Sequence, residues 1–178
     1  TSKINNSILH KIWFELPPFI SETQIEHVEK MCAGLTQKKI NRFVLSHLSQ
    51  QTMLPPHSRF ATNETVYAYN DAAALWLKQQ GAEWFCSPVE NEYENLLTGA
   101  CRETAIPVYF RPRLFTSRMP VTLTNNLFAD ERKNHYIRQR LNGLTIILPE
   151  QPVCITQYAN KLRAKGFCRF LIDLTFEP

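Results

Sequence analysis

The stretch "YAYNDAAALWLKQQGAEWFCSPVENEYENL", residues 67–96, passes twice from a strand-like segment into a helix-like segment. The first passage crosses Asn70 and Asp71, either of which suits the N-cap of a helix. The second crosses Ser87 and Pro88, with Glu90 three residues after the serine. Serine followed by an acid at this spacing has the form of a capping box, and proline is favoured at the first helical position. The stretch therefore predicts two helices that begin at the carboxyl ends of strands.

The same alternation extends along the chain. Strands are predicted over 11–16, 40–48, 64–70, 83–87, 106–110 and 167–174, and helices over 21–35, 71–80, 88–99 and 155–166. Parallel neighbours in a sheet need a crossover, which is normally a helix, so this order favours parallel βαβ units. The dipeptide Asn142-Gly143 lies between two further strand-like segments and predicts an added β-hairpin.

The length of the chain limits the choice of architecture. Its 178 residues, of which 44% are hydrophobic, suffice for one sizeable core. A complete eight-fold barrel usually needs about 250 residues. We therefore expect an α/β fold, a partial or shortened TIM-like barrel with mainly parallel strands, as a single domain over 1–178 and a fragment of a longer barrel protein. An open doubly wound sheet is the alternative, and both architectures bind ligands at the carboxyl ends of their strands.

Charge and composition exclude few function classes. Twenty Lys and Arg residues against sixteen Asp and Glu give a net charge of +4, without a basic run. This admits an anionic partner but does not argue for one. No stretch approaches the roughly 20 apolar residues of a membrane span, and the N-terminus lacks the apolar core of a signal peptide, so a cytoplasmic protein is predicted. The five cysteines form no CxxC pair, which favours free thiols and predicts neither a metal nor a cofactor.

The candidate ligand site combines helix ends with arginines. The predicted helix N-termini at Asn70 and Ser87 offer unpaired N–H groups that suit a phosphate or carboxylate. Arg111 and Arg113 follow the predicted strand 106–110, and guanidinium groups bind the same anions. The predicted ligand-binding residues are therefore Asn70, Ser87, Glu90, Arg111 and Arg113. The alternatives are caps that only start helices and a solvated basic loop.

Candidate catalytic residues are few. His47, at the end of the second predicted strand, is the histidine best placed for proton transfer, with a structural role as the alternative. No nucleophile elbow, phosphate loop or zinc-ligand spacing is present, so the catalytic residues are unknown. Four aromatic residues near the predicted strands are expected to pack in the core: Tyr67, Tyr69, Trp76 and Trp84.

The opening stretch, with "IPVYFRPRL" and "ITQYANKLRAKGFCRFLIDL", resembles the collagenase-like peptidase family of unassigned catalytic type over roughly residues 35–174. That family has an N-(S/D)-x-x-A-x-x-L-x-x-x-G helix before a strand that ends in L-S-P-E. The residues of this chain that match the two motifs are Asn70, Asp71, Ala74, Leu77, Gly81, Ser87 and Pro88. Val89 replaces the acid of the second motif, and Glu90 follows one residue later.

The resemblance implies a hydrolase of the peptidase type, or else a non-catalytic or subunit-completing barrel domain. It also implies kinship with proteins that hydroxylate RNA bases or quinone precursors, several of which hold an iron–sulfur cluster. Here Phe115 stands where the family has its first cysteine, so we expect no cluster bound by this chain alone. The expected partners are an anionic or peptide ligand, and the rest of a longer chain or a partner subunit.

Overall fold

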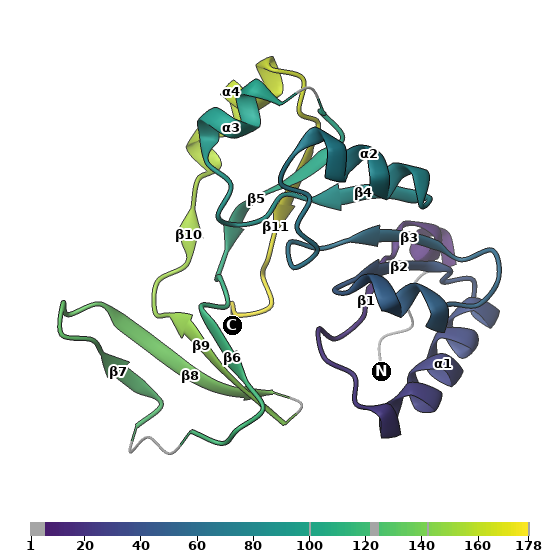
Figure 1. Ribbon diagram of the computed structural model, residues 1–178, viewed down its shortest axis with the longest axis horizontal. Coiled ribbons are helices and arrows are strands. Elements are labelled where there is room, and N and C mark those ends of the chain that lie inside the picture. The colour runs from purple at the N-terminus through teal and green to yellow at the C-terminus, as the bar shows by residue number, and fades with distance from the viewer. Residues whose placement is uncertain (1–5, 100, 122–124, 142, 178) are drawn as a thin grey trace. The chain divides into compact units, whose positions relative to one another are not determined.

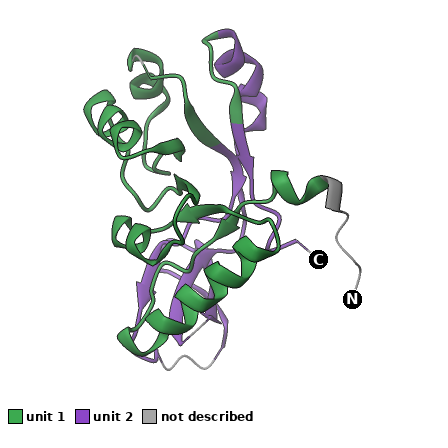
Figure 2. Ribbon diagram, turned by 90° about the vertical axis from the view of Figure 1, so that its right-hand side faces the viewer, with its two compact units in different colours: residues 1–106, 165–169 green, residues 107–164, 170–178 purple. Residues whose placement is uncertain are grey.

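A computed structural model describes residues 6–99, 101–121, 125–141 and 143–177 (Figure 1). The chain divides into two compact units (Figure 2). Unit 1 contains residues 1–106 and 165–169, and unit 2 contains residues 107–164 and 170–178. The expectation that residues 1–178 form a single domain, a fragment of a longer barrel protein, stays a prediction.

The first sheet is mainly parallel. Its first five strands pair in parallel in chain order: β1 (Phe14–Glu15), β2 (Arg42–Leu45), β3 (Arg59–Thr62), β4 (Ala82–Cys86) and β5 (Thr104–Phe110). Two further strands pair with β5, the antiparallel β10 (Val153–Cys154) and β11 (Arg169–Ile172). The mixed α/β class with a mainly parallel sheet is therefore confirmed, as a partial barrel requires.

Helices alternate with the strands of the first sheet along the chain. They are η1 (Asn6–Lys11), α1 (Glu22–Gln37), η2 (Leu48–Met53), α2 (Asp71–Gln79), α3 (Tyr93–Thr98), η3 (Thr156–Tyr158) and α4 (Ala159–Ala164), where η marks a 3₁₀ helix. α1 begins at the predicted Ser21, whose N–H donates to Gln24 Oε1 at 3.2 Å. α2 begins after Asn70, whose Oδ1 accepts from the Ala73 N–H at 2.9 Å. It ends before Gly81, where a φ of +93° favours glycine.

The second sheet is antiparallel and belongs to unit 2. Its strands are β6 (Phe115–Ser117), β7 (Leu127–Ala129), β8 (His135–Leu141) and β9 (Leu144–Pro149), in the order β6-β9-β8-β7. The predicted hairpin is confirmed as β8 and β9, and Gly143 has a φ of +79° between them. Asn142 lies outside the described residues. The sequence predicted neither β6 nor β7, because both are only three residues long.

The core of unit 1 lies between the parallel strands and the helices. Phe43, Phe60 and Phe85 from β2, β3 and β4 belong to one buried cluster, and α1 contributes Val28 and Cys32. In strands successive side chains point to opposite faces, so each strand gives one set to this helix-side core. The other set points to the opposite face, where polar residues gather at the strand ends.

The third strand and the start of the third helix were predicted wrongly. The strand lies at Arg59–Thr62 rather than 64–70, because its three last side chains are buried whereas Tyr67 is 61% exposed. Tyr69 and Trp76 are exposed as well, so the core packing predicted for them is wrong. The helix predicted over 88–99 is only α3, since residues 88–91 form a turn that the Asn91 N–H closes on Pro88 O.

Candidate binding site at the carboxyl ends of the parallel strands

Polar side chains gather where β1 to β4 end, on the sheet face opposite the helix-side core of unit 1. In the parallel register Glu15 of β1 pairs with Val44 of β2, and Val44 pairs with Ala61 of β3. Ser46 and Asn63 come two residues after Val44 and Ala61, directly after β2 and β3 end, so they lie on the same face. We call these three residues, together with Cys86 at the end of β4 and Glu64, whose charge acts on Cys86, the strand-end cluster: Glu15, Ser46, Asn63, Glu64 and Cys86.

Asn63 organises the strand-end cluster. Its Nδ2 donates to Glu15 Oε1 and to Ser46 Oγ, both at 2.8 Å. Its Oδ1 accepts from the Thr65 N–H at 3.0 Å and from Thr65 Oγ1 at 2.7 Å. Ser46 Oγ in turn donates to Leu16 O at 2.9 Å. Since Asn63 is 3% exposed and uses both ends of its amide, it fixes the Glu15 carboxylate relative to β2 and β3.

Cys86 is a buried thiol at the end of β4. The side chain is fully buried, and this burial raises the pKa of the Cys86 thiol far above its usual range. The negative charges of Glu64 and Glu15 raise the pKa further. Since only a thiolate is a good nucleophile, Cys86 in this environment is a neutral packing residue. Both charges therefore act on the same buried thiol at the end of β4.

His47 forms the contacts of a helix cap. Its Nδ1 lies 2.8 Å from Ser49 Oγ and accepts from the Ser49 N–H at 3.3 Å, at the start of η2. Gln50 supports this turn, because its Oε1 accepts from the N–H groups of Ser46 and His47. Its Nε2 donates to Pro17 O at 2.7 Å. The contacts favour the structural role for His47, and proton transfer by this residue stays a prediction.

Three of the predicted ligand-binding residues lie in unit 1. Asn70 caps α2, as predicted. Ser87 is buried, accepts from Asn91 Nδ2 at 3.1 Å and does not begin a helix. The capping box predicted at Ser87 is therefore wrong, because α3 starts at Tyr93 with Glu92 as its N-cap.

Glu90 joins two loops of unit 1. Its Oε1 accepts from the Tyr67 hydroxyl at 3.0 Å, and this contact raises the pKa of Tyr67. A second link is made by Asn95 Nδ2, which donates to Tyr69 O at 3.3 Å. The structure thus brings the loop before α2 and the loop before α3 together, as the prediction of a shared edge requires.

The other two predicted ligand-binding residues lie in unit 2. Arg111 Nη2 donates to Glu150 O at 3.0 Å, and its guanidinium lies 4.5 Å from the centroid of the Phe176 ring. Its Nε is buried and has no hydrogen-bond partner. Arg113 is exposed. Arg111 therefore holds the C-terminal segment of unit 2 through contacts within that unit, and anion binding by these two arginines stays a prediction.

Among the residues that the structure describes there is neither a metal-binding cluster nor a helix suited to cross a membrane. Within residues 6–99, 101–121, 125–141 and 143–177, no three His, Cys, Asp or Glu side chains gather so as to hold a metal ion. Phe115, at the place of the family cysteine, lies in β6 and is exposed. No described helix has the length and apolar character needed to cross a membrane. A cytoplasmic location stays a prediction.

Comparison with known proteins adds no assignment. No family model matches the chain, and searches of the curated proteins and of the solved structures find no match. The resemblance to the collagenase-like peptidase family therefore remains a hypothesis that rests on the sequence motifs.

Sequence reasoning missed the strand-end cluster. Glu15 carried a usable signal, because it is an acidic residue between Phe14 and Leu16 at the end of an apolar strand. Asn63 was not recognised because the third strand was predicted over 64–70, whereas β3 ends at Thr62, directly before Asn63. Correct placement of β3 would have put Ser46 and Asn63 on adjacent strand ends.

Proposed function

We propose that the chain is a barrel-type domain, related to the collagenase-like peptidase family, that binds the cationic group of a peptide. The binding site is the strand-end cluster of unit 1. The observation that carries the proposal is the fixed Glu15 carboxylate, whose Oε1 accepts from Asn63 Nδ2 at 2.8 Å, while the charge of Glu64 acts on the same buried Cys86 thiol as Glu15. A peptide amine or guanidinium pairs with such carboxylates through charge-assisted hydrogen bonds.

The charges at this edge of unit 1 favour a cation over the anion expected from the sequence. Asp71 lies in the first turn of α2, where its Oδ1 accepts from the Cys101 N–H at 3.0 Å. Glu90 lies on the adjoining loop, and Glu15 and Glu64 lie at the strand ends. A bound phosphate at this edge would face these carboxylates, and like charges repel at short range.

The contacts of Cys86 and His47 favour peptide binding without cleavage. A covalent peptidase needs a nucleophile activated by a neighbouring base. The buried, protonated Cys86 thiol does not meet this requirement, and His47 is engaged with Ser49. This favours the non-catalytic alternative over the peptidase activity that the resemblance implies.

The test is a calorimetric titration of the 178-residue chain with the dipeptide Lys-Gly and with its fully acetylated form. The proposal predicts that only the unacetylated dipeptide binds. In Glu15→Gln the side-chain oxygen that accepts from Asn63 is retained while the charge is lost. A lost charge-assisted contact of about 1.5–3 kcal/mol should weaken binding about tenfold to hundredfold.

Glu131→Gln is the matched control, because it removes the same charge from an exposed position of unit 2. Its affinity for the dipeptide should equal that of the wild type. Equal affinity in wild type and Glu15→Gln, or equal binding of the acetylated dipeptide, would contradict the proposal. Mass spectrometry of a longer peptide after incubation with the chain tests cleavage separately. Cleavage of more peptide molecules than there are protein molecules would support the peptidase hypothesis.

A further inference from the structure

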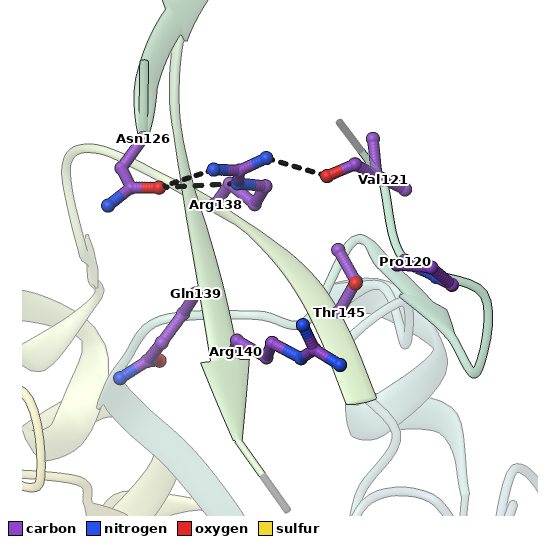
Figure 3. A pocket seen from close by; sticks show the side chains of 7 residues that line it. All are labelled: Pro120, Val121, Asn126, Arg138, Gln139, Arg140 and Thr145. Carbon is purple, nitrogen blue, oxygen red and sulfur yellow. Dashed lines mark hydrogen bonds between the residues drawn. The ribbon is translucent and has the colours of Figure 1, made fainter. Parts of the chain in front are cut away.

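One face of the antiparallel sheet carries two arginines beside a hollow. Arg138 and Arg140 are two residues apart in β8, so their side chains start on the same face. Thr145 of β9 is the direct cross-strand partner of Arg140. A hollow of about 280 Å³ lies at this place in unit 2, lined by Pro120, Val121, Asn126, Arg138, Gln139, Arg140 and Thr145 (Figure 3).

Arg138 is held in place by neutral acceptors. Its Nε and Nη2 donate to Asn126 Oδ1 at 3.2 and 2.8 Å, and its Nη1 donates to Val121 O at 2.6 Å (Figure 3). Neither acceptor carries a charge, so these bonds fix the guanidinium without neutralising it. The positive charge of Arg138 therefore acts on the hollow from a fixed position.

Arg140 lies beside this fixed charge and is exposed. In the part of the chain that the structure describes, the ion pairs involve Lys30, Arg59, Lys78 and His135, and neither arginine of the hollow. No residue that lines the hollow is acidic. Two neighbouring cations without a carboxylate repel each other, and an anion between them removes that repulsion.

We infer that the hollow binds a small anionic ligand through Arg140, with Arg138 as the fixed neighbouring charge. The guanidinium of Arg140 offers a planar fork of N–H donors that matches the oxygens of a phosphate or a carboxylate. A volume of about 280 Å³ lies just below the range of about 300–1,000 Å³ for small-molecule sites, so the ligand is a small metabolite. This inference concerns unit 2 and is independent of the peptide site proposed in unit 1.

The experiment titrates the 178-residue chain with glycerol 3-phosphate, with succinate and with a ten-residue deoxythymidine oligonucleotide. Arg140→Gln removes the guanidinium from an exposed strand position, so it leaves the fold intact, which the thermal midpoint verifies. Arg163→Gln removes an exposed arginine from α4 in the same unit and is the matched control. We expect Arg140→Gln to weaken binding of the small anion about tenfold to hundredfold and Arg163→Gln to leave it unchanged.

Glycerol 3-phosphate and succinate show whether the hollow prefers the oxygens of a phosphate or those of a carboxylate. Binding of either ligand supports the inference. Three results would overturn it. The first is that neither small anion binds to the wild type. The second is that both variants bind the anion as tightly as the wild type, or both lose the same affinity. The third is that only the oligonucleotide binds, which would assign the arginines to a nucleic-acid surface instead.

Discussion

The parallel strands of unit 1 and the antiparallel sheet of unit 2 place their polar residues in different ways. In unit 1 the strand-end cluster is assembled from Glu15 of β1, Cys86 of β4 and the residues that follow β2 and β3, and its bond between Glu15 and Asn63 joins residues 48 positions apart along the chain. In unit 2 Arg138 and Arg140 are neighbours on one strand, and the turn at Gly143 brings Thr145 beside them. One site depends on long-range packing, and the other depends on a local hairpin.

The two sheets also differ in what stabilises them. Unit 1 has a core that joins the parallel strands to α1 and α2. In unit 2 the buried cluster of the antiparallel sheet consists of Leu144, Ile146 and Leu148 from the single strand β9. Cross-strand hydrogen bonds and turn contacts therefore supply a larger share of the stability of the antiparallel sheet. Core substitutions should affect the two units very differently.

The largest effect is expected for Phe85→Ala. Phe85 is completely buried in β4, so its truncation removes apolar contacts and leaves a cavity that costs about 3–5 kcal/mol of the free energy of unfolding. Leu127→Ala in β7 is the contrast, because this side chain is 49% exposed and should cost less than about 0.5 kcal/mol. Urea titration measures both values. A cost below about 1 kcal/mol for Phe85→Ala would contradict the packing described for unit 1.

The next largest effect is expected for Asn63→Ala. This substitution leaves Ser46 and Thr65 without their buried partner and frees the Glu15 carboxylate, at a cost of about 2–3 kcal/mol. Asn160→Ala, at an exposed position of α4, is the control and should change stability little. Thermal unfolding checks both variants. Equal midpoints for the two would show that the strand-end cluster is not a rigid network.

Much of the fold could be predicted from the sequence, because α1, α2 and the β8–β9 hairpin have strong local signals. Ser21 with Gln24, Asn70 with Gly81, and Gly143 mark these elements through capping and turn preferences that act over a few residues. The strand β3 was missed because it has only four residues, three of them buried, and such a short segment has no distinctive pattern. The candidate site was missed for a related reason, since Glu15 and Asn63 become neighbours only after β1, β2 and β3 pair.

A smaller effect is expected on the pH dependence of stability. The pKa of Cys86 is raised in the folded protein, whereas an unfolded thiol ionises near pH ~8.5. The stabilising contribution of the neutral thiol is therefore fully present below pH ~8.5 and is lost as the pH rises above that value. The free-energy difference between wild type and Cys86→Ala should shrink by up to about 1.4 kcal/mol per pH unit in that range.

Urea titrations from pH 7 to 9.5 measure this difference. Cys168→Ala removes an exposed thiol and serves as the control, with a difference from wild type that should stay constant. A constant difference for Cys86→Ala as well would mean that Cys86 is accessible to solvent, which would contradict the burial described for it.

The smallest effect is expected at the turn between β7 and β8. Asp130 accepts from the side chain and the backbone N–H of Asn134 and from the Tyr136 hydroxyl, and these bonds lower its pKa. Its contribution is present above the usual pKa of about 3.9 and is lost as the pH falls through the lowered folded-state pKa. Asp130→Ala should speed amide exchange in β7 and β8 slightly at pH 7. Unchanged exchange at this pH would show that the turn contacts do not stabilise the sheet.

The strand-end cluster of unit 1 is expected to bind a cation, and the hollow of unit 2 is expected to bind an anion. The most direct test is a calorimetric titration of both ligands into wild type and both variants. Lys-Gly and glycerol 3-phosphate are each titrated into wild type, Glu15→Gln and Arg140→Gln. The fixed carboxylate in unit 1 and the exposed arginine in unit 2 predict that Glu15→Gln weakens only the peptide and Arg140→Gln weakens only the phosphate. The contradicting result is a variant that weakens both ligands, or wild-type protein that binds neither.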